Sequence, residues 1–410
     1  MERKKIVITG MGAVTPIGVG VETYWNNLIQ GVSGIDTIQK LDVDALPIKV
    51  AAEVKDFRAK DYMSPKLANS MEDFMQYAYV SAQEALTASG LEVEPYRTGI
   101  VMSTALGGLN ATEQTQRKLS EQGTRVGPKF LTRVLGNIAA AQFAIAHQIQ
   151  GPSLTVSTAC ASGNDAIATA TTLLRAGEAD VMVVMGGESG GSTLLIQSLA
   201  RALALTNNPD PATACRPFDA NRNGFVVGEG GGALILETEE HALARNATIL
   251  AEVAGCASNN DAFHTVAPRD DGDGARRCMI AAMANANLAP EDIDYINTHG
   301  TSTEKGDAVE VMAIHAALGE RAKQIGISST KGATGHLMGA GGLIEAVACV
   351  QAIRTGMLPP TLHYQTPDPL CDLDVIPNVA RPQAIRTAMS NAFGFGGQNA
   401  CIIFQKYGDS

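Results

Sequence analysis

The sequence predicts an α/β protein in which buried strands alternate with helices. Two observations support this fold class: short apolar runs rich in β-branched residues recur along the chain, and they alternate with longer segments whose apolar residues have helical spacing. Glycine-containing turns separate the two kinds of segment. Such alternation is typical of a parallel sheet covered by helices on both faces. The sequence has no linker or low-complexity segment, so we expect the 410 residues to pack as one body.

The first part of the chain contains four predicted strands. They are short and apolar, and they lie at residues 5–10, 99–103, 153–157 and 179–185, the third expected as a buried strand. The predicted helices are rich in alanine or carry apolar residues at helical spacing, and they lie at residues 21–29, 68–89, 137–148 and 166–176, with another after Gly107 and Gly108. Glycine and proline predict a turn region at residues 11–20, and polar residues predict irregular structure at 54–64.

A second cycle of the same elements follows. Its predicted strands lie at residues 231–237, 251–257, 293–298, 325–330 and 400–404, and its predicted helices at 275–286, 307–318 and 343–354. Residues 325–354 repeat the form of residues 153–176, namely a strand, a turn of small residues and an alanine-rich helix. The two segments share little identity, so a duplicated α/β fold is inferred from periodicity alone.

Composition excludes several classes of protein. The net charge of −11 and the 5% aromatic content argue against nucleic-acid binding, which normally needs a basic surface. Seven cysteines without a C-x-x-C pair argue against a zinc site or a disulfide framework and indicate a reducing compartment. The sequence has no signal peptide pattern, and no apolar run approaches the ~20 residues of a membrane span. We therefore expect a soluble, cytoplasmic protein that does not bind membranes.

Cys160 lies among small residues between a predicted strand and a predicted helix. The unpaired N–H groups and the dipole at a helix N-terminus favour an anion by roughly 0.3 to 1 kcal/mol, which lowers a thiol pKa. Because the thiolate is the attacking form, Cys160 is a candidate nucleophile. A cysteine among alanines is as easily explained as a small buried side chain. The local sequence leaves these two interpretations equally open.

Further polar side chains follow other predicted strands. His299 comes after the strand at 293–298, Lys331 and His336 lie in a glycine-rich turn after 325–330, and Phe395 lies between glycines before the closing strand. Sites in α/β proteins gather at the carboxyl ends of strands, although a single histidine there is more often structural. One cysteine, two histidines and a lysine together fit a thioester enzyme. Two imidazoles can hydrogen-bond a developing enolate oxygen, and this chemistry needs no metal.

Four motifs in this order resemble those of the β-ketoacyl-acyl carrier protein synthases. They are TACASG at 158–163, HGTST at 299–303 followed by Gly306-Asp307, Lys331 with Gly335-His336, and GFGG at 394–397. The likeness runs from residues 7–12 to the closing strand and is greatest to the elongating synthases of bacterial type II fatty acid synthesis. It implies a thiolase fold with five αβαβα layers, built from a half at 1–250 with the nucleophile and a half at 251–410 with the other motifs. It also implies a homodimer.

The resemblance assigns roles to the candidate residues. Cys160 corresponds to the acyl-accepting nucleophile, and His299 and His336 to the pair that supports malonyl decarboxylation and stabilises the enolate. Lys331 corresponds to the lysine of the active-site hydrogen-bond network. Phe395 corresponds to a gate for the acyl chain, and its N–H with that of Cys160 forms the oxyanion hole. The implied reaction is a decarboxylative Claisen condensation between an acyl group on Cys160 and malonyl-acyl carrier protein, with both substrates delivered by the carrier.

Other residues match the family less closely. The implied gating loops contain Asp261, His264, Gly394, Gly396 and Gly397, the implied acyl pocket contains Leu106, Phe130 and Gln197, and the implied carrier-docking residues are Lys66, Lys129 and Arg201. Lys66 is the only charged residue between 64 and 70, where relatives carry a basic run. No cofactor is expected beyond a structural Na⁺ or K⁺ at Asn297, Thr298, Glu345, Ser390 and Asn391. A carboxylate on a helix surface is an equal alternative for Glu345.

Alternative functions differ in partner or in chemistry. The ketosynthase subunit of a type II polyketide or polyene pathway shares these motifs. A non-catalytic partner subunit that sets chain length resembles the family but lacks the cysteine, so Cys160 argues against it. A thiolase uses a second cysteine in a C-x-G turn, whereas Cys401 is followed by Ile402 and Ile403 in a strand pattern. Elongation of fatty acids is therefore the leading hypothesis.

Overall fold

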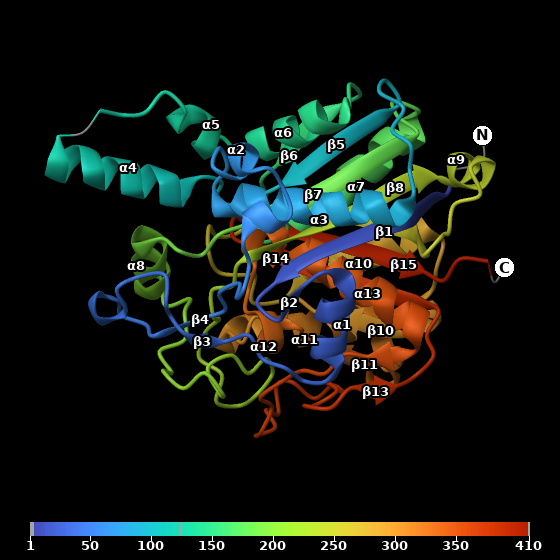
Figure 1. Ribbon diagram of the computed structural model, residues 1–410. Helices are drawn as coiled ribbons and strands as arrows, with labels where there is room; N and C mark the ends of the chain where they lie inside the picture. Colours follow the sequence, from blue (N-terminus) through green and yellow to red (C-terminus); the bar gives the residue numbers. More distant parts are fainter. Residues whose placement is uncertain (1–3, 124, 409–410) are drawn as a thin grey trace.

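A mixed β-sheet runs through the whole molecule (Figure 1). The computed structural model describes residues 4–123 and 125–408. Within them the sheet has eleven strands in the order β11-β10-β14-β15-β9-β1-β8-β7-β5-β6, with β2 paired to β1. The strands of the N-terminal half are β1 (Ile6–Thr15), β2 (Gly18–Val19), β5 (Thr98–Ser103), β6 (Ser153–Val156), β7 (Val181–Glu188) and β8 (Gly230–Thr238). Those of the C-terminal half are β9 (Ala251–Asn260), β10 (Tyr295–Asn297), β11 (Gly326–Ser328), β14 (Thr387–Gly394) and β15 (Gln398–Gln405).

The two halves of the sheet have the same topology. The order is β6-β5-β7-β8-β1 in one half and β11-β10-β14-β15-β9 in the other, so each half places its third, second, fourth, fifth and first long strands side by side. In both halves the first two pairings are parallel and the last two antiparallel. The duplication inferred from periodicity is thus confirmed. The parallel sheet that the alternation indicated is found only in the first two pairings of each half, because alternation of strands and helices does not specify the direction of every strand.

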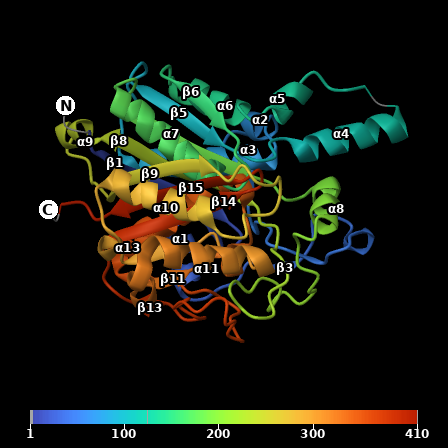
Figure 2. The same cartoon turned by 180° about the vertical axis from the view of Figure 1, so that it is seen from behind.

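Helices separate and cover the halves of the sheet, giving five layers. α7 (Ser162–Ala176) and α13 (Gly341–Thr355) lie in the middle, in contact with each other and with strands of both halves. α3 (Asp73–Ser89) and α6 (Ile138–His147) cover the outer face of the N-terminal half. α10 (Asp273–Ala286) and α11 (Glu304–Leu318) cover the outer face of the C-terminal half (Figure 2). These are the αβαβα layers expected of a thiolase fold.

Shorter elements complete the chain. The short helices and strands are α1 (Val21–Ile29), α2 (Pro65–Ala68), α5 (Phe130–Val134), α8 (Thr193–Arg201), α9 (Glu239–Ala244), α12 (Lys331–Thr334), β3 (Asp36–Thr37), β4 (Val50–Ala51), β12 (Met357–Leu358) and β13 (Arg381–Pro382). The helix expected after Gly107 and Gly108 is α4 (Leu109–Gln122), which projects from the body beside α5 (Figure 1). None of the helices in the described part of the chain is long and apolar enough to cross a bilayer.

Several predicted elements differ from the structure. β1 continues to Thr15 through the expected turn, because Gly10 and Gly12 lie against α3. A Cβ on them would be 2.1 Å from the Ala85 oxygen and 1.9 Å from the Ser81 oxygen, so these glycines allow close packing of strand and helix. β6 was expected to be buried but forms the exposed edge of the sheet, with Leu154 46% exposed.

Candidate active site

Cys160 lies on a tight turn between β6 and α7. Ala159 before it has a φ of +50°, which is rare for a residue other than glycine, and α7 begins two residues later at Ser162. The Ser162 hydroxyl donates to the Ala159 carbonyl at 2.6 Å and accepts the Thr158 N–H at 2.8 Å, which fixes the turn. A Cβ on Gly394 would be 2.8 Å from the Thr158 oxygen, so this glycine lets the neighbouring loop reach the nucleophile. The predicted position of the thiol at a helix N-terminus is confirmed.

The environment of the thiol opposes ionisation in the free enzyme. Burial raises the pKa of Cys160 to about 12, against the positive charge of Lys331 and a hydrogen bond from the Phe395 N–H, which both lower it. The expectation of a lowered pKa was therefore wrong, since desolvation outweighs the helix terminus. The Phe395 N–H donates to the sulfur, so it lies beside the nucleophile, near the place where the oxyanion of an attacked thioester would form.

The two histidines meet beside Cys160. Their ring centroids are 5.3 Å apart and their planes are at 85°, and both rings line the same pocket as the thiol. Burial, followed by the charge of Lys331, holds the pKa of His299 and of His336 well below the usual value, so both imidazoles are neutral near pH 7. Neither ring nitrogen of His336 has a hydrogen-bond partner among the described residues. A neutral ring with free nitrogens can donate to a substrate oxygen.

A buried carboxylate positions His299. The N–H groups of His299 and Gly300 donate to Glu310 of α11 at 2.9 and 2.7 Å. Burial raises the pKa of Glu310 to about 7, opposed by these hydrogen bonds. Glu310 was not predicted from the sequence. Its spacing of three residues from Asp307 on a predicted helix was the only available signal, and such spacing is common on surface helices.

Lys331 acts on the site through its charge and does not contact the pocket. It is 2% exposed, forms an ion pair with Glu345 of α13, and does not line the pocket. Its charge lowers the pKa of Cys160 and of both histidines. Glu345 is 4% exposed, so the alternative of a surface carboxylate was wrong.

The two predicted gating loops are hydrogen-bonded to each other. The Gly396 N–H donates to the Thr265 carbonyl at 2.7 Å, and the Asp261 N–H donates to the Gly397 carbonyl at 2.8 Å. His264 is exposed, and its Nδ1 accepts the N–H groups of Val266 and Ala267 at 3.0 and 3.1 Å. Gly396 and Gly397 have φ values of +84° and +72°. Movement of either loop must therefore break hydrogen bonds to the other.

A pocket of about 320 Å³ joins these groups. Its lining includes the predicted residues Cys160, Asp261, His299, His336, Gly394, Phe395 and Gly397. Leu106 belongs to the same apolar cluster as Phe395. Phe130 is half-buried on α5 and Gln197 is exposed on α8; neither lines the pocket of this single chain, so their role in the acyl pocket stays a prediction.

The residues predicted to dock the carrier are all exposed. Lys66 lies on α2, Lys129 immediately before α5 and Arg201 at the end of α8. These elements lie on the same side of the molecule as α4 (Figure 1). Their role in docking stays a prediction.

Buried oxygens gather where a cation was expected. Asn297 and Ser390 are register partners on neighbouring strands, and Asn391 follows Ser390. Asn297 Oδ1 and Ser390 Oγ are buried on one face of the sheet and have no hydrogen-bond partner within the described residues. Asn391 points to the opposite face, where its amide donates to Glu310 at 3.2 Å, so its side-chain oxygen does not join theirs. Thr298 Oγ1 donates to the Ser328 carbonyl at 3.1 Å. Unpaired oxygens of this kind fit Na⁺ or K⁺, which prefer oxygen ligands, although the bound ion stays a prediction.

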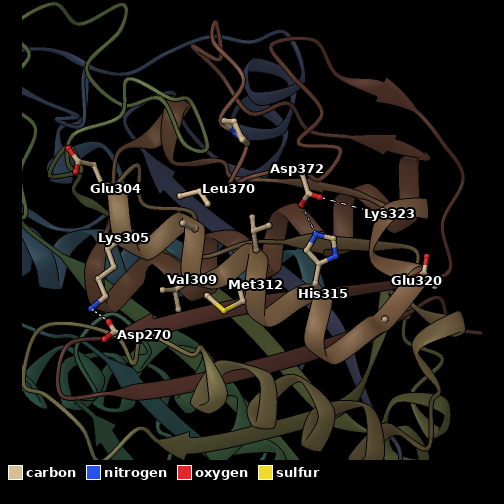
Figure 3. Close-up of a pocket in the computed structure, with 14 residues that line it drawn as sticks. Asp270, Glu304, Lys305, Val309, Met312, His315, Glu320, Lys323, Leu370 and Asp372 are labelled. Carbon is tan, nitrogen blue, oxygen red and sulfur yellow. Dashed lines mark hydrogen bonds and ion pairs between the residues drawn. The ribbon is translucent and has the colours of Figure 1, made fainter.

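A larger hollow of about 980 Å³ lies on the outer face of α11 (Figure 3). Val309, Met312 and Leu370 line it, and the ion pairs Lys305–Asp270 and His315–Asp372 lie towards its two ends. It shares Lys305 and Val309 with the pocket of Cys160 but contains neither the cysteine nor the paired histidines. Size alone would therefore have indicated the wrong site.

Comparison with known proteins agrees with the geometry. The family described as "Beta-ketoacyl synthase, N-terminal domain" matches residues 3–242, and "Beta-ketoacyl synthase, C-terminal domain" matches residues 250–365. The 3-oxoacyl-[acyl-carrier-protein] synthase 2 of Staphylococcus aureus strain COL is 42% identical over 410 residues, covering 99% of each chain. The ishigamide ketosynthase/chain length factor superposes with a TM-score of 0.93 and 33% identity, covering 99% of this chain and 100% of that one. A type II polyketide ketosynthase, solved with its acyl carrier protein, has a TM-score of 0.90, 32% identity and the same coverage.

Proposed function

This chain belongs to the β-ketoacyl synthase family, and on that basis we propose that it elongates acyl chains carried by acyl carrier protein in fatty acid synthesis. It is a condensing enzyme of the acyltransferase type, and its relatives named 3-oxoacyl-[acyl-carrier-protein] synthase 2 match it over almost its whole length. One observation carries the proposal: Cys160, His299 and His336 meet in one pocket with the Phe395 N–H directed at the sulfur.

The first half-reaction transfers the acyl chain to the enzyme. The sulfur of Cys160 attacks the thioester carbonyl of the acyl carrier, and the N–H groups of Cys160 and Phe395 stabilise the oxyanion. The bond to the carrier's sulfur then breaks, and the thiol proton leaves with the carrier thiol. Burial disfavours the free thiolate, and the charge of Lys331 and the Phe395 N–H reduce this cost without outweighing it, so the thiol loses its proton only as attack begins.

The second half-reaction forms the carbon–carbon bond. Neutral His299 and His336 donate hydrogen bonds to the thioester oxygen of malonyl-carrier, carbon dioxide leaves, and the electron pair of the broken bond forms an enolate. The enolate carbon attacks the acyl carbonyl on Cys160, the carbon–sulfur bond breaks, and the thiolate takes up a proton from solvent, which replaces the one that left with the first carrier. A single preorganised donor of this kind typically contributes about 2.7 to 4 kcal/mol.

A second copy of the chain is part of the proposal. The β6 edge of the sheet is exposed together with apolar side chains on nearby elements, namely Leu131, Leu135, Ile145 and Leu154. An unprotected edge strand with apolar neighbours is normally covered, and a homodimer with β6 at the interface covers it.

The exposed side chains of Lys66, Lys129 and Arg201 would offer positive charge to an acidic carrier protein. Seven free cysteines support a cytoplasmic location, where thiols stay reduced.

The cation is proposed as a structural element. Asn297, the last residue of β10, and Ser390, in the middle of β14, would hold Na⁺ or K⁺ close to the turn of His299. Its charge would compensate the oxygens that lack donors there. Glu345 would contribute less, because its carboxylate is already paired with Lys331.

A condensation assay tests the function. Purified enzyme is given malonyl-carrier with a ladder of acyl-carriers from short to long, and we expect one two-carbon extension to a β-ketoacyl-carrier. Formation of poly-β-keto products would instead favour the polyketide ketosynthase function, which one of the solved relatives, a type II polyketide ketosynthase, suggests. Failure to condense any acyl-carrier would refute both functions.

A further inference from the structure

Leu203 is an exposed leucine just after α8. Its side chain is 87% exposed, more than any other large apolar side chain in the part of the chain that the structure describes. The next two residues, Ala204 and Leu205, are 8% and 6% exposed and pack in an apolar cluster. A single exposed leucine is ordinary by itself. Its backbone and its position are what set this one apart.

The backbone at Leu203 favours a smaller residue. α8 ends in two hydrogen bonds, from the Leu203 N–H to the Ala200 carbonyl and from the Ala204 N–H to the Leu199 carbonyl, both at 3.1 Å. This helix end places Leu203 in the left-handed region, with a φ of +56°. Glycine or asparagine normally occupies this position, because a larger side chain strains the backbone there. Leucine is therefore strained at this position, and folding does not bury its side chain in return.

Leu203 lies at the opening of the Cys160 pocket. It lines this pocket while it is almost fully exposed, as does Val266, which is 41% exposed. Arg201, two residues before Leu203, is also exposed. A thioester on a carrier protein has to pass this opening to reach Cys160. The protein that carries the thioester must then lie over the residues around the opening.

We propose that Leu203 is an apolar contact for the acyl carrier protein at the opening of the Cys160 pocket, and that Val266 extends this contact. The docked carrier removes the leucine side chain from water, which stabilises the complex and not the free enzyme. Such a contact adds to the attraction of the few exposed cations, and salt does not screen it. The inference rests on the proposed function, which requires substrates bound to a carrier.

Glycine at this position should move stability and binding in opposite directions. Leu203→Gly relieves the backbone strain, so we expect its thermal unfolding midpoint to rise. The same change removes the apolar contact, so we expect the Kd for labelled holo-acyl carrier protein, measured by fluorescence anisotropy, to rise about tenfold. A side chain that served only the fold would weaken stability and binding together when it is removed.

A substrate without a carrier separates docking from the shape of the pocket. Self-acylation of Cys160 is measured with an acyl-carrier and with the same acyl group on N-acetylcysteamine. The ratio of kcat/KM for the carrier substrate to kcat/KM for the small substrate should fall about tenfold in Leu203→Gly. This fall should be the same at low and high ionic strength, whereas the effect of Arg201→Ala should shrink as salt is added.

Two matched variants control for the loss of an exposed leucine. Leu194 is 57% exposed on the same helix and does not line the pocket, so Leu194→Asn should leave the Kd and the ratio unchanged. Leu203→Met keeps an apolar side chain on the same backbone, so it should keep the Kd within about twofold of the wild-type value.

The outcomes distinguish this inference from the function itself. Equal carrier binding by wild-type enzyme and Leu203→Gly would overturn the inference, as would wild-type enzyme that binds no carrier. A changed oligomeric state of Leu203→Gly in analytical ultracentrifugation, with an unchanged carrier Kd, would assign the leucine to a contact between copies of the chain and would also overturn it. Because binding is measured without chemistry, wild-type enzyme that binds the carrier through Leu203 but condenses nothing would refute the proposed function alone.

Discussion

Removal of the Lys331 charge perturbs both the fold and the nucleophile. Lys331 and Glu345 are 2% and 4% exposed and form an ion pair, so Lys331→Met leaves an unpaired carboxylate in the core. Breaking a buried pair in this way typically costs about 3 to 5 kcal/mol. Burial already raises the pKa of Glu345, so the unpaired carboxyl can take up a proton. This limits the loss of stability to about 3 kcal/mol, the lower end of that range. The double variant Lys331→Met/Glu345→Gln should recover most of it, since no buried charge remains.

The same substitution reports on Cys160. Lys331 lowers the thiol pKa against desolvation, so its loss raises that pKa further, and each unit of increase reduces the thiolate fraction about tenfold. Denaturant unfolding measures the stability of the two variants, and the pH dependence of thiol alkylation measures ionisation. The double variant should keep the slow alkylation of the single variant although its stability recovers. A single variant as stable as wild type, with an unchanged alkylation profile, would refute the assigned role of Lys331.

Three further results are expected. Cys160→Gln should abolish elongation but leave malonyl-carrier decarboxylation, because the histidines handle the enolate; condensation by this variant, measured as β-ketoacyl product, would contradict the assignment. His336→Ala should lose decarboxylation and condensation by about 100-fold or more, as for loss of a preorganised donor, while Cys160 still takes up a radiolabelled acyl group; failure to acylate would show that the roles are misassigned. The rate of decarboxylation by Cys160→Gln should not fall as the pH drops through 6.5. The pKa values of both histidines lie well below 6.5, so the imidazoles take up protons only at lower pH. A loss of activity centred near pH 6.5 would contradict neutral, buried imidazoles.

The sequence was sufficient for most of the long elements and for the four motifs, because both depend on local patterns, but α8 was not predicted. Helical spacing predicted α1 at its observed bounds, and the turns with Cys160, His299 and His336 do follow strands. Strand direction and sheet position depend on tertiary pairing instead. A β-branched run such as Ser153–Val156 has the same composition at an exposed edge as in the middle of a sheet, so the burial of β6 was mispredicted.

No local sequence pattern indicated the buried carboxylate that positions His299. Glu310 lies at an ordinary position in a helix, and only the folded chain brings backbone N–H groups to it. The thiol pKa of Cys160 is a similar case. The helix N-terminus is local and was predictable, but desolvation by surrounding segments is not, and it decides the direction of the shift.

Duplication explains why a thiol and an imidazole face each other. Cys160 follows the third long strand of its half and precedes α7, and His336 follows the third long strand of the other half and precedes α13. The two helices are neighbours in the middle layer, and at their N-terminal ends a Cβ on Gly163 would be 2.9 Å from the Gly342 Cα. Such close approach of equivalent helix starts brings the two loops to one point. The second half can therefore supply a hydrogen-bond donor to the reaction of a nucleophile in the first half through the symmetry of the fold.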